Sequence, residues 1–215
     1  MKSLTKVLPA IAAAILPLSV SAEPAHAARV ERSAAQAPGF YRVMLGDFEI
    51  TVLTDGTTPV PFADLLHGIS RGELAEIFRA AGEPLDRETS INSFLIDTGE
   101  RRILIEAGAG GLFGDCCGRL PAMLKEAGYS PESIDAVLLT HVHGDHSGGL
   151  TVDGRRVFPN AEIYLAKQEL EYWLSDVAKA RAKASHSKMF EEGRAALAPY
   201  YAAGRIRTFT APAEL

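Results

Sequence analysis

The stretch Leu139–Gly149, with the sequence LTHVHGDHSGG, carries three histidines and an aspartate within six positions: His141, His143, Asp145 and His146. Half of the six histidines of the chain lie here. Neutral imidazole nitrogens and carboxylate oxygens are the usual ligands of zinc and similar divalent ions. A packed core gains nothing from such a cluster, because each ring has polar nitrogens that must find partners. The stretch therefore predicts a metal site.

The residues before the cluster predict how its first half is oriented. Ile134–Thr140 is short, apolar and partly β-branched, which is typical of a buried strand. His141 and His143 follow it two positions apart, so at an extended strand end they point to the same side. We expect these two rings to face one point in space.

A sharp turn is expected between the two halves of the cluster. Gly144 allows the chain to turn with a positive φ if one is needed. Asp145 and His146 would then approach from another direction, so the four side chains could serve two neighbouring metals. Gly148 and Gly149 would permit close backbone packing where the next element starts.

The run resembles the His-x-His-x-Asp-His signature of the metallo-β-lactamase superfamily, whose members are mostly metal-dependent hydrolases. Three upstream segments resemble successive strands of that fold: Asp55-Gly56, Asn92–Gly99 and Ile103–Gly108. Within the last of these, Glu106 stands where the family often has Asp. The resemblance implies an α/β fold, a four-layered αβ/βα sandwich with the site at the sheet edges.

The same resemblance implies the cofactors and their ligands. His141 and His143 would bind the first metal, and Asp145 and His146 the second. Zinc is the favoured ion for both positions. A metal-bound hydroxide would be the nucleophile, with Asp145 orienting the water.

Four further segments resemble the branch that contains methyl parathion hydrolase, with lactonases of acyl-homoserine lactones as close neighbours: Leu112–Gly114, Gly118–Leu120, Phe158–Ala161 and Glu169–Trp173. This resemblance implies a small-molecule substrate, namely an ester, lactone or phosphotriester. It also implies an aromatic substrate pocket, carried over to Phe113, Trp173 and Phe190. An ordinary core position is an equally open reading for Trp173 and Phe190.

Composition limits the classes of partner. The chain has 215 residues, 47% of them hydrophobic, which is enough to build a sizeable core. The net charge of −5 does not favour binding to nucleic acid, whose phosphates are negatively charged. We therefore expect a small-molecule substrate and no nucleic-acid partner. The oligomeric state stays open, a homodimer included.

The N-terminus has the features of an export signal. Lys2 and Lys6 precede the apolar stretch Val7–Val20, and small residues follow it. We expect a signal peptide at 1–27, a linker at 28–38 and a metallo-β-lactamase-like domain at 39–215, in a periplasmic or secreted protein. No stable membrane anchor would remain after cleavage; an uncleaved anchor is the alternative.

Hydrophobic periodicity and turn residues predict the remaining elements. They are a hairpin over Tyr41–Asp55, a loop over Thr57–Pro61, a helix over Arg71–Ala81, strands at Ile91–Asp97 and Arg102–Glu106, a helix over Leu120–Ala127, a strand at Ala161–Leu165 and a mostly helical Gln168–Leu197.

The ligand set is expected to be incomplete. Catalytic zinc usually has three protein ligands, but after His146 the only histidine is His186, in a polar helical context. We therefore expect the domain to be incomplete at its C-terminus, as the N-terminal part of a longer enzyme. Such a chain would bind metal weakly and hydrolyse little.

Particular residues are also compatible with other functions. An iron-dependent redox enzyme on the same fold, or an inactive truncated chain, is compatible with the metal motif. Gly68–Gly72 fits the Gly-x-Ser-x-Gly pattern of serine hydrolases, but the residues before it make a poor strand, so a loop is favoured. The adjacent Cys116 and Cys117 are expected to be small residues of a turn, because neighbouring cysteines rarely bridge without strain.

Overall fold

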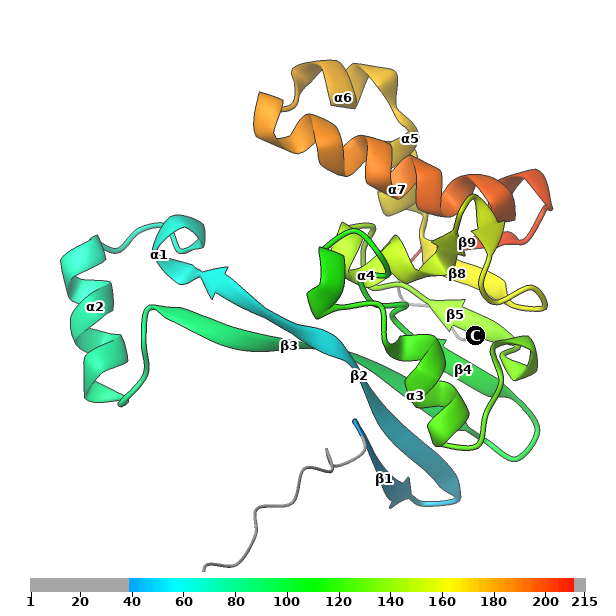
Figure 1. The fold of residues 1–215 in the computed structure, drawn as a ribbon. Coiled ribbons are helices and arrows are strands. Elements are labelled where there is room, and N and C mark those ends of the chain that lie inside the picture. The colour runs from blue at the N-terminus through cyan, green and yellow to red at the C-terminus, as the bar shows by residue number, and fades with distance from the viewer. Residues whose placement is uncertain (1–38, 211–215) are drawn as a thin grey trace, which may run out of the picture. The chain divides into compact units, whose positions relative to one another are not determined.

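A seven-stranded mixed sheet organises the structure, with the strand order β1-β2-β3-β4-β5-β8-β9 (Figure 1). The first four strands pair antiparallel, and β4, β5, β8 and β9 pair parallel. The strands of this sheet are β1 Phe40–Leu45, β2 Phe48–Pro61, β3 Asp86–Asp97, β4 Arg102–Ile105, β5 Ala136–Leu138, β8 Glu162–Ala166 and β9 Ile206–Phe209. The mixed α/β class expected from the sequence is confirmed.

Helices and short connecting elements join these strands. The α-helices are α1 Phe62–Leu65, α2 Arg71–Ala80, α3 Leu120–Glu126, α4 Gly144–Ser147, α5 Lys167–Leu174, α6 Asp176–Arg181 and α7 Ala184–Ala202. Short 3₁₀ helices are η1 Gly114–Cys116, η2 Pro131–Ser133 and η3 Gly148–Leu150, and a small hairpin pairs β6 Thr151–Val152 with β7 Arg155–Arg156.

This computed structural model describes residues 39–210, all of them in the unit Ala37–Leu215. The expected signal peptide and linker, residues 1–38, lie outside the described residues. Within residues 39–210, no helix is long and apolar enough to cross a membrane.

One face of the sheet is fully buried against helices. Leu95, Leu104, Val137 and Ile163 stand in register across four strands, and none of them is exposed. Helices α3, α5 and α7 add large side chains to the same core, among them Leu120, Leu124, Trp173, Phe190, Leu197 and Tyr200. Burying a large apolar side chain stabilises the fold by roughly 1.5–3 kcal/mol, so this face anchors the structure.

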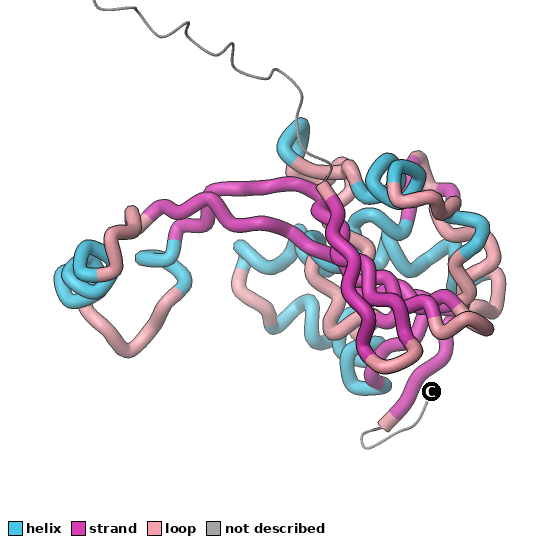
Figure 2. The backbone as a smooth tube through the Cα atoms, turned by 90° about the horizontal axis from the view of Figure 1, so that it is seen from below, coloured by secondary structure: helices cyan, strands magenta, loops and turns pink. Residues whose placement is uncertain are grey.

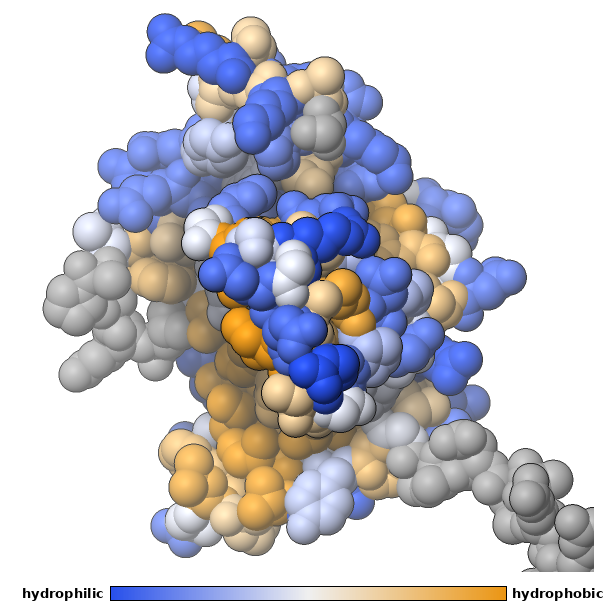
Figure 3. Space-filling view, turned by 90° about the vertical axis from the view of Figure 1, so that its left-hand side faces the viewer, coloured by the Kyte–Doolittle hydropathy of each residue, from blue (hydrophilic) through white to orange (hydrophobic). Residues whose placement is uncertain are grey.

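The opposite face carries a second apolar row that is not buried. Paired positions run across six strands, and none of their side chains is buried: Tyr41, Val52, Phe94, Ile105, Leu138 and Tyr164. Strands that are apolar on both faces are typical of a sheet covered on both sides. Figure 3 shows an area of apolar side chains in the lower part of the view, with smaller apolar areas elsewhere on that face. Among residues 39–210, helices thus bury only one face of the seven-stranded sheet.

The β2–β3 hairpin is much longer than the sequence suggested. Thr57–Pro61 was expected to be a loop but continues β2, paired with Asp86–Ser90 of β3. Among residues 39–210, only β3 pairs with this part of β2, and an edge position tolerates Pro59 and Pro61 because their missing N–H groups are not needed. Figure 2 shows the hairpin extending past the other strands.

The predicted helical stretch Gln168–Leu197 is helical but divided into α5, α6 and α7. Ser175 ends α5 and caps α6, its hydroxyl accepting a hydrogen bond from the Ala178 N–H (3.1 Å). Lys183, in extended conformation, separates α6 from α7. A serine cap inside a charged, alanine-rich run was not recognised as a boundary.

A buried tyrosine in α7 offers a direct test of the core. The Tyr200 hydroxyl donates to the Leu150 carbonyl (3.0 Å) and accepts from the Phe158 N–H (3.1 Å). Tyr200→Phe should lower the free energy of unfolding by about 1–3 kcal/mol, because the buried Phe158 N–H loses its acceptor and the Leu150 carbonyl keeps only the Val157 N–H as a donor. Urea denaturation followed by circular dichroism measures this change.

The adjacent Tyr201 is a matched control, since its side chain is 62% exposed. Tyr201→Phe should change stability by no more than about 0.5 kcal/mol. Equal effects of the two substitutions would contradict the assigned role of the Tyr200 hydroxyl.

Candidate metal centre

The histidine motif lies at the end of a central strand, as expected. β5 ends at Leu138, and His143 is the N-cap residue of the short helix α4. The turn is made by the start of α4 rather than by a positive φ, since Gly144 has none. A Cβ on Gly144 would lie 3.1 Å from Leu112 Cδ1, so a larger residue there would require this side chain to shift by a few tenths of an ångström.

Gly148 and Gly149 allow close backbone packing, which confirms the expectation for this pair. A Cβ on Gly148 would lie 2.3 Å from the Ala109 carbonyl oxygen, and one on Gly149 would lie 1.9 Å from that of Ala107. No side chain fits at such distances. The loop that follows β4 is therefore held directly against the metal motif.

Three imidazoles of the motif converge. His141 Nε2 lies 3.1 Å from His143 Nδ1, and the rings of His141 and His146 have centroids 4.0 Å apart. The other ring nitrogen of His141 faces the Thr140 hydroxyl at 2.9 Å. The spacing of the motif thus brings side chains from both sides of the turn together.

The donor pair formed by His141 and His143 fits a metal ion. Two nitrogens bound at 2.0–2.1 Å to a tetrahedral zinc lie roughly 3.3 Å apart, close to the 3.1 Å found here. Among residues 39–210, however, no group of three or more His, Cys, Asp or Glu side chains surrounds one point. His141 and His143 therefore have the spacing of two metal ligands, but the described residues do not complete a metal site.

Carboxylates on both sides control the charge of His146. Its Nε2 lies 3.3 Å from Asp145 Oδ2, and its Nδ1 lies 3.3 Å from Glu106 Oε2, without the alignment of a full hydrogen bond. Asp145, and then Glu106, raise the pKa of His146 to about 9. Burial, followed by the charge of His146, lowers the pKa of His141. The two histidines thus differ in protonation at neutral pH.

Asp145 responds to the same contact. Burial acts to raise the pKa of its carboxyl, but the close contact with the His146 ring and the charge of that ring outweigh burial and lower the pKa overall. Asp145 is accordingly a carboxylate at neutral pH, the form in which it can bind a metal or orient water.

Glu106 contacts both the backbone directly before His141 and the ring of His146. Its carboxylate is buried, and Oε1 accepts a hydrogen bond from the Thr140 N–H (3.0 Å) directly before His141. Its backbone has a φ of 63°, a conformation that costs a non-glycine residue about 1–2 kcal/mol. The longer side chain, which the sequence set apart from the family pattern, thus bridges the end of β5 and His146.

Glu169 is a site residue that the sequence reasoning missed. Its Oε2 accepts hydrogen bonds from the Val142 N–H (3.1 Å) and from Trp173 Nε1 (2.9 Å). The Trp173 ring in turn packs edge-on against His143, with centroids 5.3 Å apart. One carboxylate on α5 therefore holds both the motif backbone and the aromatic ring behind it.

A cavity of about 570 Å³ opens beside the motif. Its walls come mainly from the far half of the β2–β3 hairpin, and it is lined by Thr58, Pro59, Val60, Pro61, Leu65, Thr89, Ser90, Ile91, Asn92, Phe94, Phe113, Asp145, His146 and Met189. Asp145 and His146 are its only ionisable lining residues. The cavity thus joins an apolar chamber to two of the four motif residues.

The three aromatic residues named from the sequence lie in different places. Phe113 lines this cavity and is 41% exposed. Trp173 and Phe190 do not line it; they are 5% and 0% exposed and pack together in the core, with ring centroids 4.7 Å apart. Trp173 reaches the site through its ring contact with His143 and its hydrogen bond to Glu169.

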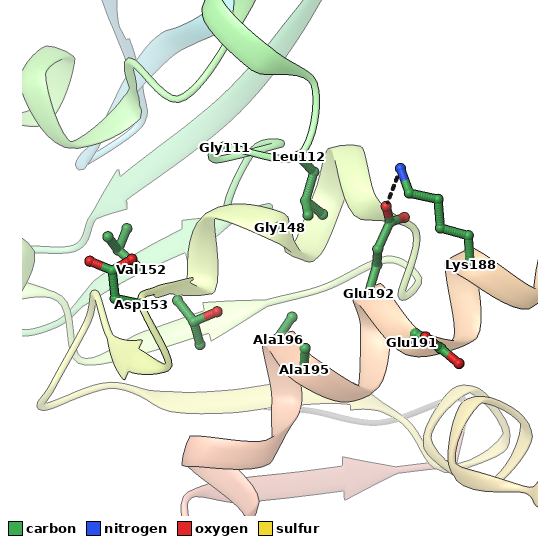
Figure 4. A pocket seen from close by; sticks show the side chains of 11 residues that line it. Gly111, Leu112, Gly148, Val152, Asp153, Lys188, Glu191, Glu192, Ala195 and Ala196 are labelled. Carbon is green, nitrogen blue, oxygen red and sulfur yellow. Dashed lines mark ion pairs between the residues drawn. The ribbon is translucent and has the colours of Figure 1, made fainter.

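A second cavity, of about 630 Å³, lies along α7 (Figure 4). It is lined by Gly148, Val152, Asp153 and residues of α7, including the ion pair of Lys188 with Glu192 (2.9 Å). None of the four motif residues lines it, so it is separate from the candidate metal centre.

Asp55 fixes the loop that frames the site. Its side chain is fully buried and accepts three backbone hydrogen bonds, from Ala109 (2.9 Å), Gly118 (3.1 Å) and Leu120 (2.9 Å). Gly108 has a φ of 72°, and a Cβ there would lie 2.5 Å from the Asp55 carboxyl carbon. The Asp55-Gly56 segment noted in the sequence is therefore a clamp on the loop that carries Phe113.

Comparison with known proteins identifies the class. The family model of the metallo-beta-lactamase superfamily matches residues 86–203, more than half of the chain and including the whole histidine motif. The chain belongs to the metallo-beta-lactamase superfamily.

Individual relatives cover parts of the chain. The solved structure of AbOPH, a hydrolase in the beta lactamase superfamily, is 35% identical, with a TM-score of 0.78 over 84% of this chain and 64% of its own. AidC, a dizinc quorum-quenching lactonase, is 24% identical, with a TM-score of 0.73 over 82% of this chain and 63% of its own. It shares the fold.

Among curated proteins, the exodeoxyribonuclease WalJ of Streptococcus pneumoniae is 28% identical over 110 residues, 49% of this chain and 36% of its own length. The chain thus spans under two thirds of these structural neighbours and about a third of this curated relative.

The Asp55 clamp generates a stability prediction. Asp55→Asn should lower the free energy of unfolding by about 2–4 kcal/mol, because the new amide group faces backbone N–H donors that then lose their acceptor. Thermal unfolding monitored by circular dichroism tests this.

Asp47, exposed in the β1–β2 turn, supplies the control substitution. Asp47→Asn should stay within about 0.5 kcal/mol of the unaltered chain. An Asp55→Asn protein as stable as the Asp47→Asn protein would disprove the clamp.

Proposed function

We propose that this chain carries the substrate cavity and the first part of the metal centre of a hydrolase that acts on uncharged esters, lactones or phosphotriesters. The observation that carries the proposal is the apolar cavity opening on Asp145 and His146. Superfamily membership supports hydrolysis as the reaction type.

The lining of the cavity favours uncharged substrates. Apart from Asp145 and His146, every lining side chain is apolar or carries a neutral hydroxyl or amide. A cavity of about 570 Å³ is in the range that encloses a small organic molecule. Apolar walls remove water from the substrate, and Thr58, Ser90 and Asn92 offer neutral polar groups to orient it.

The same lining argues against a nucleic-acid substrate, although a curated relative is an exodeoxyribonuclease. Phosphate backbones are bound chiefly by Lys and Arg. The cavity has neither, and the chain has a net charge of −5. We therefore propose a small-molecule substrate and, in keeping with the N-terminal sequence, an exported enzyme.

Each motif residue has a role that follows from its contacts. His141 and His143 would hold one divalent metal, zinc being favoured, and Asp145 and His146 would contribute to a second. A bound metal supplies Lewis-acid chemistry, lowering the pKa of water and polarising the substrate oxygen. Asp145, ionised and facing the cavity, orients the attacking water and accepts its proton.

Full activity is proposed to need ligands from outside the described residues. Two donors per metal are fewer than the three that catalytic zinc usually has. The apolar row on the opposite face of the sheet also supports a need for residues outside the described ones, because no layer among residues 39–210 covers it. We propose that such a layer brings the remaining ligands.

Zinc binding to the isolated chain should be weak and coupled to proton release. The pKa of His146 is raised to about 9 in the metal-free protein, so at pH 7.5 its ring is protonated and has no free lone pair. Binding must displace that proton, and affinity should rise with pH up to about pH 9, by up to tenfold per pH unit. Isothermal titration calorimetry in buffers of different ionisation enthalpy measures the released proton.

His146→Gln should abolish this pH-linked release, while His67→Ala, at an exposed position away from the motif, should leave it unchanged. Tight binding of two ions per chain together with ester turnover would show that the described ligands suffice. Absence of proton release at pH 7.5 would contradict the assigned state of His146.

Binding in the cavity should discriminate by charge. An uncharged acyl lactone should bind the chain, whereas its ring-opened carboxylate should bind at least tenfold more weakly, because the cavity offers no cationic side chain besides His146. Ligand-detected NMR titration compares the two without requiring turnover.

Phe113→Ala should weaken lactone binding about tenfold, since it removes an aromatic wall. Phe48→Ala is the control, because Phe48 is similarly exposed (46%) but lies outside the cavity. Equal affinity for lactone and carboxylate, or equal effects of the two substitutions, would refute the proposed substrate class.

A further inference from the structure

Cys116 and Cys117 form a close pair of thiols on the loop that frames the site. Both are free and partly exposed, and their Sγ atoms lie 2.9 Å apart. A disulfide bond measures about 2.05 Å, so less than about 1 Å of approach separates the two sulfurs from bonding distance. Neither thiol has a role in the proposed hydrolysis.

The backbone around the pair is held at two points. The Cys116 carbonyl oxygen and the Cys117 Cα press against β2, where a Cβ on Gly56 would meet them at 1.9 and 2.7 Å. On the far side, the Gly118 N–H donates to Asp55. Any change in the link between Cys116 and Cys117 must therefore be transmitted to the loop or to β2.

The loop also touches the candidate site. The Cys116 thiol donates to the Phe113 carbonyl (3.2 Å), and Phe113 lines the cavity. The neighbouring Leu112 packs over Gly144 and Gly148 of the metal motif. Gly114 and Gly118 have positive φ values of 71° and 82°, so the segment between them is bounded by residues with unusual backbone freedom.

We propose that Cys116 and Cys117 are a thiol–disulfide exchange site for small disulfides, and that closing the pair reshapes the Gly110–Gly118 loop and the wall that Phe113 contributes. This proposal depends on the proposed function in one respect only, namely that Phe113 contributes a wall of the substrate cavity. Adjacent Cα atoms are at most about 3.8 Å apart, below the usual 4.4–6.8 Å of bridged cysteines, so the backbone must move when the bond forms.

The chemistry balances in two steps. The Cys116 sulfur, as thiolate, attacks a small disulfide such as oxidised glutathione, forming a mixed disulfide and releasing one small thiol. The Cys117 sulfur then loses its proton, attacks Cys116 Sγ and releases the second small thiol. Two protein thiols are oxidised, one small disulfide is reduced to two thiols, and the two protons end on those thiols.

The structure assigns Cys116 as the point of entry. Burial, reinforced by the contact with Cys116, raises the pKa of the Cys117 thiol to about 12, so Cys117 is a poor nucleophile toward molecules in solution. Cys117 attacks only the neighbouring Cys116 sulfur, because the short distance between the two atoms compensates for its low nucleophilicity. A bridge between adjacent residues is strained and hence easily reduced, as a reversible site requires.

Intact-mass spectrometry and hydrogen–deuterium exchange test the proposal on the full chain. Treatment with oxidised glutathione at pH 8 should remove two hydrogen atoms from the mass and leave no glutathione attached. Peptides covering residues 109–120 should then exchange about tenfold faster, because amides bound to Asp55 lose protection. Dithiothreitol should reverse both changes.

The Cys116→Ser, Cys117→Ser double variant should show neither change, and peptides from α7 should exchange equally in both states. If that variant does not fold, alkylation of the native chain with iodoacetamide before oxidation gives the same control. A persistent mixed disulfide, a disulfide-linked dimer, or a bridge without altered exchange at residues 109–120 would each overturn the proposal.

Discussion

The site depends on the hydrogen bonds that the Asp55 carboxylate accepts from the backbone. This carboxylate is fully buried, and its burial is tolerated because three backbone N–H groups donate to it, two from the loop after β4 and one from the start of α3. That loop packs its backbone against Gly148 and Gly149, and its Phe113 forms a cavity wall. A single charged group on β2 thus ties the hairpin, the loop and the metal motif together.

The parts of the site that are local in sequence could be predicted. The facing of the His141 and His143 rings followed from strand geometry, and the need for small residues at Gly148 and Gly149 followed from close packing. Both depend on residues a few positions apart. The strand and helix pattern likewise fixed the α/β class, although the serine cap at Ser175 and the one-sided pairing of β2 displaced element boundaries.

Contacts between distant segments could not be predicted from the sequence. Glu106 is separated from Thr140 by 34 positions and Glu169 from Val142 by 27, and no local pattern marks either pair. Trp173 and Phe190 are aromatic residues on helices, where periodicity cannot separate a core position from a pocket wall. Only the folded chain shows that they lie behind His143 and that the cavity is built largely from the β2–β3 hairpin.

The cavity walls and the metal motif lie on parts of the structure that tolerate substitution differently. The motif follows the buried strand β5 and packs against the core, where each substitution disturbs many neighbours. The far half of the hairpin pairs only with itself, so its length and side chains can vary while the core and the ligand geometry stay intact. Substrate range can therefore diversify independently of the chemistry, with one scaffold supporting many specificities.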